Sequence, residues 1–125
     1  MAQKKEEECV TLPSVLVVVS FPLIGELITS RLRAEGMYPR EWDGTSRLDD
    51  PCDLVIIDCG DHGGQKVLEQ IHANPRTANL PVIFFTSGVT HKTAEELGVD
   101  FCITKPFSGL DLMRKVRTCL KKETR

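Results

Sequence analysis

Four residues with reactive side chains follow directly on short apolar runs in this chain of 125 residues. In chain order they are Ser20, Asp58, Thr86 and Lys105. A carboxylate can accept a phosphoryl group, while a hydroxyl and an ammonium can hold the oxygens of that group. If the fold brings these side chains together, the combination predicts a phosphoryl-accepting site.

The runs that precede these residues have the composition of buried strands. They cover residues 15–19, 54–57, 81–85 and 100–104 and are rich in Val, Ile and Phe. Short apolar runs without polar alternation predict strands that are covered on both faces. Ligands of open α/β sheets bind beyond the carboxyl ends of the strands, so the reactive side chains are expected at one edge.

Helical patterns alternate with the predicted strands. Helical spacing of apolar residues starts at Pro22 and stops at Gly36, then resumes after a turn over residues 59–64. A short helix is predicted over residues 90–97, and Ser108 is placed to cap a last helix. The last helix is expected to turn one apolar face to the core, formed by Leu110, Met113, Val116 and Leu120. Alternating strands and helices predict an α/β fold with a parallel sheet and helices on both faces.

The segment between Gly36 and residue 54 is the least regular part of the pattern. Residues 38–42 can form an outer strand, but only the 11 residues 43–53 then remain for the crossover. A parallel crossover usually takes a dozen residues or more. We therefore expect a short or absent second crossover helix, at most a turn or two around residues 45–48. If apolar sheet surface is left bare there, a homodimer or another partner is expected to cover it.

Composition narrows the class of protein. The length fits one domain, predicted over residues 13–122 between a solvated tail (1–12) and a short C-terminal tail (123–125). Sixteen basic against eighteen acidic residues give no electrostatic reason to expect nucleic acid binding. No apolar run is long enough to span a membrane and the start lacks a secretory signal, so a cytoplasmic location is expected.

The cysteines are odd in number and scattered, which argues against a disulfide framework and a structural zinc site. They are Cys9, Cys52, Cys59, Cys102 and Cys119. Free cysteines in a reducing compartment usually act as small buried apolar residues. Cys59 alone has a second interpretation, a redox-sensitive thiol beside Asp58, which requires a lowered pKa.

These motifs resemble the receiver domain of two-component response regulators. The resemblance is carried by Asp58 after Leu-Val-Ile-Ile, Thr86 after Val-Ile-Phe-Phe, and Phe-Cys-Ile-Thr-Lys-Pro-Phe over residues 101–107. It implies that Asp58 is the phosphoacceptor, Thr86 the switch hydroxyl, Phe101 the switch aromatic and Lys105 the phosphate-sensing lysine. It also implies a flavodoxin-like, doubly wound parallel sheet of five strands in the order 2-1-3-4-5.

The chain departs from the receiver pattern at the metal site. Receivers resemble one another in an acidic pair after the first strand that binds Mg²⁺, and here Val19 and Ser20 stand at the matching positions. Mg²⁺ prefers carboxylate and other oxygen ligands in octahedral geometry, so Asp58 alone predicts a weak site. Asp61 is a candidate substitute ligand, although Asp before His and two glycines is favoured as turn chemistry.

Two functions follow from the resemblance. In the first, a histidine kinase or phosphotransfer protein phosphorylates Asp58. The new charge then shifts the surface formed by the fourth helix, last strand and last helix toward a downstream protein partner. In the second, the chain is a pseudo-receiver, a protein-interaction module that acts without phosphorylation. Neither function makes the chain an enzyme.

Overall fold

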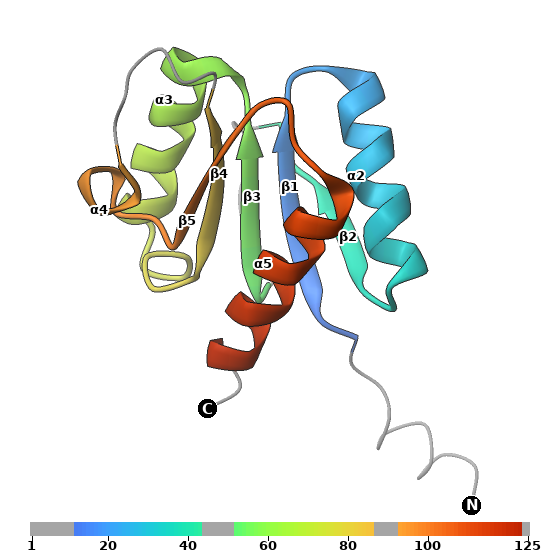
Figure 1. The fold of residues 1–125 in the computed structure, drawn as a ribbon. Helices are drawn as coiled ribbons and strands as arrows, with labels where there is room; N and C mark the ends of the chain where they lie inside the picture. Colours follow the sequence, from blue (N-terminus) through green and yellow to red (C-terminus); the bar gives the residue numbers. More distant parts are fainter. Residues whose placement is uncertain (1–11, 44–51, 87–92, 124–125) are drawn as a thin grey trace, which may run out of the picture.

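The computed structural model describes residues 12–43, 52–86 and 93–123 (Figure 1). These residues form a five-stranded parallel sheet in the order β2-β1-β3-β4-β5. The strands are β1 (Ser14–Val19), β2 (Tyr38–Glu41), β3 (Leu54–Asp58), β4 (Val82–Thr86) and β5 (Phe101–Thr104). The helices are α2 (Pro22–Ala34), α3 (Gly60–Ala73), α4 (Ala94–Leu97) and α5 (Gly109–Glu123). The predicted flavodoxin-like fold and its strand order are confirmed.

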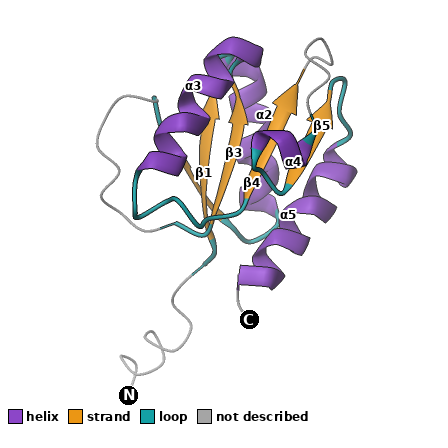
Figure 2. Ribbon diagram, turned by 90° about the vertical axis from the view of Figure 1, so that its left-hand side faces the viewer, coloured by secondary structure: helices purple, strands orange, loops and turns teal. Residues whose placement is uncertain are grey.

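The central strands are apolar along most of their length because both faces of the sheet are covered. Alternate residues, such as Val15 and Val17 of β1, pack with Leu32 and Met113 under α2 and α5. The residues between them face the other side, where a second apolar cluster includes Leu16, Val18, Val55, Ile57, Phe84, Leu68 and Ile71. Figure 2 shows α3 on one side of the sheet and α2 and α5 on the other. This period of two is the one that strand geometry requires.

The segment after Asp58 is helical from Gly60, so the predicted turn over residues 59–64 is wrong. A Cβ added at Gly64 would lie 2.9 Å from Cζ of Phe84, which is a buried ring of β4. A Cβ at Gly63 would lie 3.5 Å from the nearest side-chain atom, an ordinary contact. The glycine at position 64 therefore permits close helix–sheet packing rather than a turn.

The short fourth helix begins later than predicted. Thr93 is extended and forms a reciprocal capping box with Glu96, so α4 starts at Ala94 and not at Thr90. Residues 90–92 lie outside the described part of the chain. Gly98, at φ +75°, ends the helix in the left-handed conformation that glycine adopts without steric cost.

The predicted face of the last helix is partly wrong. Ser108 Oγ accepts a hydrogen bond from the Asp111 N–H at 3.2 Å, as a cap would, and Met113 and Val116 are buried. Leu110, however, is 56% exposed, and Leu112 takes the buried position. Helical spacing gives the period of a buried face but leaves its rotation about the helix axis to the packing.

The outer strand predicted over residues 38–42 is observed as β2, which pairs with β1. The helix predicted around residues 45–48 lies outside the described residues. Trp42 packs against the apolar cluster under α3, which weakens the reason to expect a homodimer on that face. Within the described ranges, no helix combines the length and the apolar character needed to cross a membrane.

Candidate functional site

The carboxyl edge of the sheet brings together the residues that were expected to meet there. Val19, the last residue of β1, is in register with Asp58, the last residue of β3, and the Ser20 N–H donates to the Asp58 carbonyl at 3.1 Å. The Lys105 N–H donates to the carbonyl of Thr86, the last residue of β4, at 3.1 Å. The main chain thus places the ends of four neighbouring strands at one rim.

Asp58 is the only residue with a carboxylate among the fully buried side chains of the described chain. Its exposed fraction is 0%, and Lys105 Nζ lies 2.7 Å from its Oδ1. Neither carboxylate oxygen has a hydrogen-bond partner of regular geometry among the described residues, and the contact with Lys105 is an ion pair. Removing a carboxylate from water costs several kcal/mol, and the ammonium is the group that offsets this cost.

The segment that carries Lys105 is held on both sides of the lysine. The Lys105 N–H donates a hydrogen bond to Thr86 of β4, and the peptide bond between Lys105 and Pro106 is cis. Two residues on, the ring of Phe107 packs edge-on against Phe85, with 4.8 Å between centroids. The ammonium also lies 5.9 Å from the ring centroid of Phe21, which follows β1. The Lys105 ammonium therefore lies close to both the Asp58 carboxylate and the Phe21 ring.

The described residues at the rim do not supply the set of oxygen ligands that Mg²⁺ requires. Val19 packs against the apolar core, and Ser20 is exposed with only a neutral hydroxyl to offer. The side chain of Asp61 is outside the described part of the structure, so its predicted role as a ligand stays a prediction. Among the side chains that are described, no three or more His, Cys, Asp or Glu residues are arranged to hold a metal ion. Asp58 therefore belongs to no such group among the described residues.

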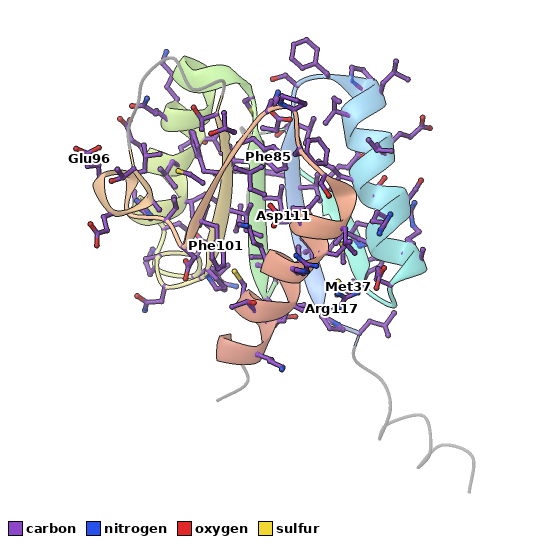
Figure 3. The ribbon with its side chains drawn as sticks, in the orientation of Figure 1. Met37, Phe85, Glu96, Phe101, Asp111 and Arg117 are labelled. Carbon is purple, nitrogen blue, oxygen red and sulfur yellow. The ribbon has the colours of Figure 1, made fainter. Side chains whose placement is uncertain are left out.

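Phe101 occupies the start of β5, on the side of the sheet that α5 covers (Figure 3). Its half-buried ring lies under Lys115, whose Nζ is 5.5 Å from the ring centroid. Lys115 also contacts both oxygens of Asp111 at 3.0 Å. Sequence reasoning identified Phe101 but not Lys115 or Phe21, because nothing in the periodicity pairs either residue with its distant partner.

Cys59 is a half-buried thiol rather than an activated one. The pKa of the Cys59 thiol is raised, first by burial and also by the nearby Asp58 carboxylate. Hydrogen bonds with the Ser20 side chain and the Asp58 backbone lower the pKa but do not cancel this rise. The thiol donates to the Val18 carbonyl at 3.4 Å. Burial likewise raises the pKa of Cys102. A reactive thiolate requires the opposite shift, so the small apolar role expected for Cys59 fits the structure better.

Known proteins with similar sequences and structures belong to one class. No family model matches the sequence. The regulatory protein VanRc of Enterococcus gallinarum is 31% identical over 121 residues, which cover 89% of this chain and 51% of VanRc. A signal receiver domain of a two-component histidine kinase from Clostridium thermocellum is 28% identical, with a TM-score of 0.71 over 87% of this chain and 98% of that domain.

In sequence and in fold, the chain is similar to the receiver domains of response regulators. It spans about half the length of the curated relative it matches. The receiver domain of a sensor histidine kinase from Pseudomonas aeruginosa PAO1 has the same fold, with a TM-score of 0.74 and 22% identity over 89% of this chain and 99% of that domain. That structure has a magnesium ion coordinated in its active site cleft. A receiver domain of this class is a module of two-component signalling.

Proposed function

We propose that this receiver takes part in a phosphorelay with Asp58 as the phosphoacceptor. A histidine kinase or phosphotransfer protein would present a phosphohistidine. The P–N bond breaks as an oxygen of Asp58 forms the new P–O bond, and the histidine nitrogen takes up a proton. The observation that carries this proposal is the pairing of Asp58 with Lys105 at 2.7 Å on the carboxyl edge. An ammonium at this position can bind an oxygen of the transferred phosphoryl group.

Thr86 and Phe101 are assigned to the response that follows. Thr86 ends β4 as a buried hydroxyl residue, and its carbonyl is bonded to the amide of Lys105. A phosphoryl group on Asp58 would be contacted by both Lys105 and Thr86, and the resulting shift of β4 and β5 would move Phe101. The downstream protein then binds the surface formed by α4, β5 and α5. Phosphorylation acts in this scheme by shifting an existing equilibrium.

A pseudo-receiver is the second candidate function, and one observation favours it. The carboxylate of Asp58 is fully buried under Lys105, and Val19 and Ser20 offer no carboxylate to a metal ion. A buried nucleophile reacts only if Lys105 moves aside. In the pseudo-receiver, the Asp58–Lys105 pair is structural and the chain binds its partner in a single state.

Intact-mass measurement after incubation with acetyl phosphate separates the two functions. The phosphorelay function predicts one phosphoryl adduct on the wild-type chain and none on Asp58→Asn. Glu69→Gln, which alters an exposed carboxylate of α3, is the matched control and should be labelled like wild type. An unlabelled wild-type chain, tested with and without Mg²⁺, would refute the phosphorelay function and leave the pseudo-receiver.

A further inference from the structure

We propose that Lys105, held in place by the ring of Phe21, is the built-in counter-cation of Asp58 and replaces a divalent metal ion at this site. The proposal deepens the proposed function, since it states how the same carboxylate is neutralised. It makes Phe21 a positioning residue that acts through Lys105.

The environment of Asp58 already contains a cation. The carboxylate is fully buried, and Lys105 Nζ at 2.7 Å is the cation that faces it among the described residues. A buried charge without a close partner costs several kcal/mol, so this ammonium stabilises the buried carboxylate. A metal ion would have to share or displace a cation that is already in contact.

A metal ion at Asp58 would need further oxygen ligands. At the end of β1, Val19 presents an apolar side chain to the core and Ser20 an exposed hydroxyl. Glu26, Glu41 and Asp43 line a cavity of about 690 Å³ together with Val19 and Phe21. These carboxylates form no metal-binding group with Asp58. Mg²⁺ binds poorly to a single carboxylate that is already paired.

Phe21 follows β1 and lies near the Lys105 ammonium. The N–H of the preceding residue, Ser20, donates a hydrogen bond to the Asp58 carbonyl at 3.1 Å, and the Phe21 carbonyl accepts one from the Gly25 N–H at 3.0 Å. The main chain is thereby fixed between β1 and α2 while 57% of Phe21 stays exposed. Burial of apolar surface does not explain an aromatic residue that is this exposed, but the ring of Phe21 lies 5.9 Å from Lys105 Nζ. Cation–π contacts at exposed sites are worth about 0.5–1 kcal/mol, enough to bias a flexible lysine toward one position.

Metal binding can be measured without any phosphoryl chemistry. Backbone amide resonances of Ser20, Cys59 and Thr86 are followed by NMR during titration with Mg²⁺, in the wild-type chain and in Asp58→Asn. The expected result is no saturable shift in wild type beyond that of Asp58→Asn at millimolar Mg²⁺. The double variant Val19→Asp/Ser20→Asp should gain such a shift. A saturable, Asp58-dependent shift in the wild-type chain would overturn the proposal even if the double variant fails to fold.

The role of Phe21 has its own readout, the hydrogen exchange of the Lys105 ammonium detected on ¹⁵Nζ. Replacement Phe21→Leu keeps an apolar side chain but removes the ring, and should speed this exchange about two- to fivefold, the equivalent of 0.5–1 kcal/mol. Phe21→Tyr keeps a ring and should exchange like wild type. Equal exchange in wild type, Phe21→Leu and Phe21→Tyr would refute the positioning role.

The two proposals fail separately. A chain that binds no Mg²⁺ and accepts no phosphoryl group from acetyl phosphate keeps the built-in cation and loses the phosphorelay. A chain that is phosphorylated on Asp58 only with bound Mg²⁺ keeps the phosphorelay and loses the built-in cation.

Discussion

Replacing Lys105 by methionine should destabilise the protein far more than neutralising its partner Asp58. Methionine keeps an unbranched side chain over the carboxylate but removes the ammonium that lies 2.7 Å from Oδ1. Asp58 would then be a fully buried, uncompensated charge. In Asp58→Asn, by contrast, the lysine side chain, which is 32% exposed, can return its ammonium to water.

The magnitude follows from the burial of the two partners. Unit charges 2.7 Å apart attract by about 6 kcal/mol at an effective dielectric constant of 20, before the cost of removing them from water is subtracted. Breaking a buried pair from one side costs about 3–5 kcal/mol, and the partial exposure of Lys105 places this case at the lower end. We expect a loss of about 3 kcal/mol for Lys105→Met and no more than about 1 kcal/mol for Asp58→Asn.

Urea unfolding followed by far-UV circular dichroism measures both effects. For a domain of this size, about 3 kcal/mol lowers the unfolding midpoint by about 2 M urea. The double variant Lys105→Met/Asp58→Asn should recover most of the loss, because it contains no buried charge. If the two single losses simply add in the double variant, the pair is not coupled and the account of Asp58 is wrong.

Three further changes test other parts of the structure. Gly64→Ala should lower the free energy of unfolding by about 1–3 kcal/mol, because the new methyl group meets a buried ring at 2.9 Å. Gly63→Ala on the same helix is the control and should be neutral or stabilising. Equal urea midpoints for the two variants would refute this. Because burial raises the pKa of Cys59, less thiolate forms at mildly alkaline pH in the folded chain. Alkylation of Cys59, located by peptide mass analysis, should therefore be slower in the folded than in the urea-unfolded chain. Faster alkylation in the folded chain would contradict this. Lys115→Met should change the ring resonances of Phe101 but lower the unfolding free energy by less than about 1 kcal/mol, and unchanged resonances would rule out the contact.

The strands and their order could be predicted because they depend on properties that adjacent residues share. Continuous apolar runs give a strand that is buried on both faces, and the alternation with helical spacing gives a parallel sheet. Residues 54–57 and 81–85 lie within one residue of the observed β3 and β4. The position of Asp58, Thr86 and Lys105 at one rim follows from the same rule, since parallel strands end at the same edge.

The features that could not be predicted depend on contacts between distant residues. Two glycines in a row suggested a turn, but Gly64 is needed where α3 approaches Phe84 of β4. The spacing of Leu110 suited a buried face, yet the packing of α5 buries Leu112 instead. Phe21 and Lys105 are far apart in the sequence, so no local pattern could pair them.

Charge at the rim explains why the absence of an acidic pair need not leave a defective site. A receiver with two carboxylates after its first strand has three acidic groups against one lysine, and a divalent cation brings this balance near neutrality. Here the contacting pair at the rim is one carboxylate and one ammonium, Asp58 and Lys105, which balance each other without a metal ion. The buried position of Asp58 is tolerable only in this balanced form, since a further carboxylate at Val19 or Ser20 would add charge that Lys105 could not offset. The replacement of the acidic pair and the close approach of Lys105 are therefore two parts of one electrostatic arrangement. A phosphoryl group would add negative charge to it, and Lys105 is the cation in place to respond.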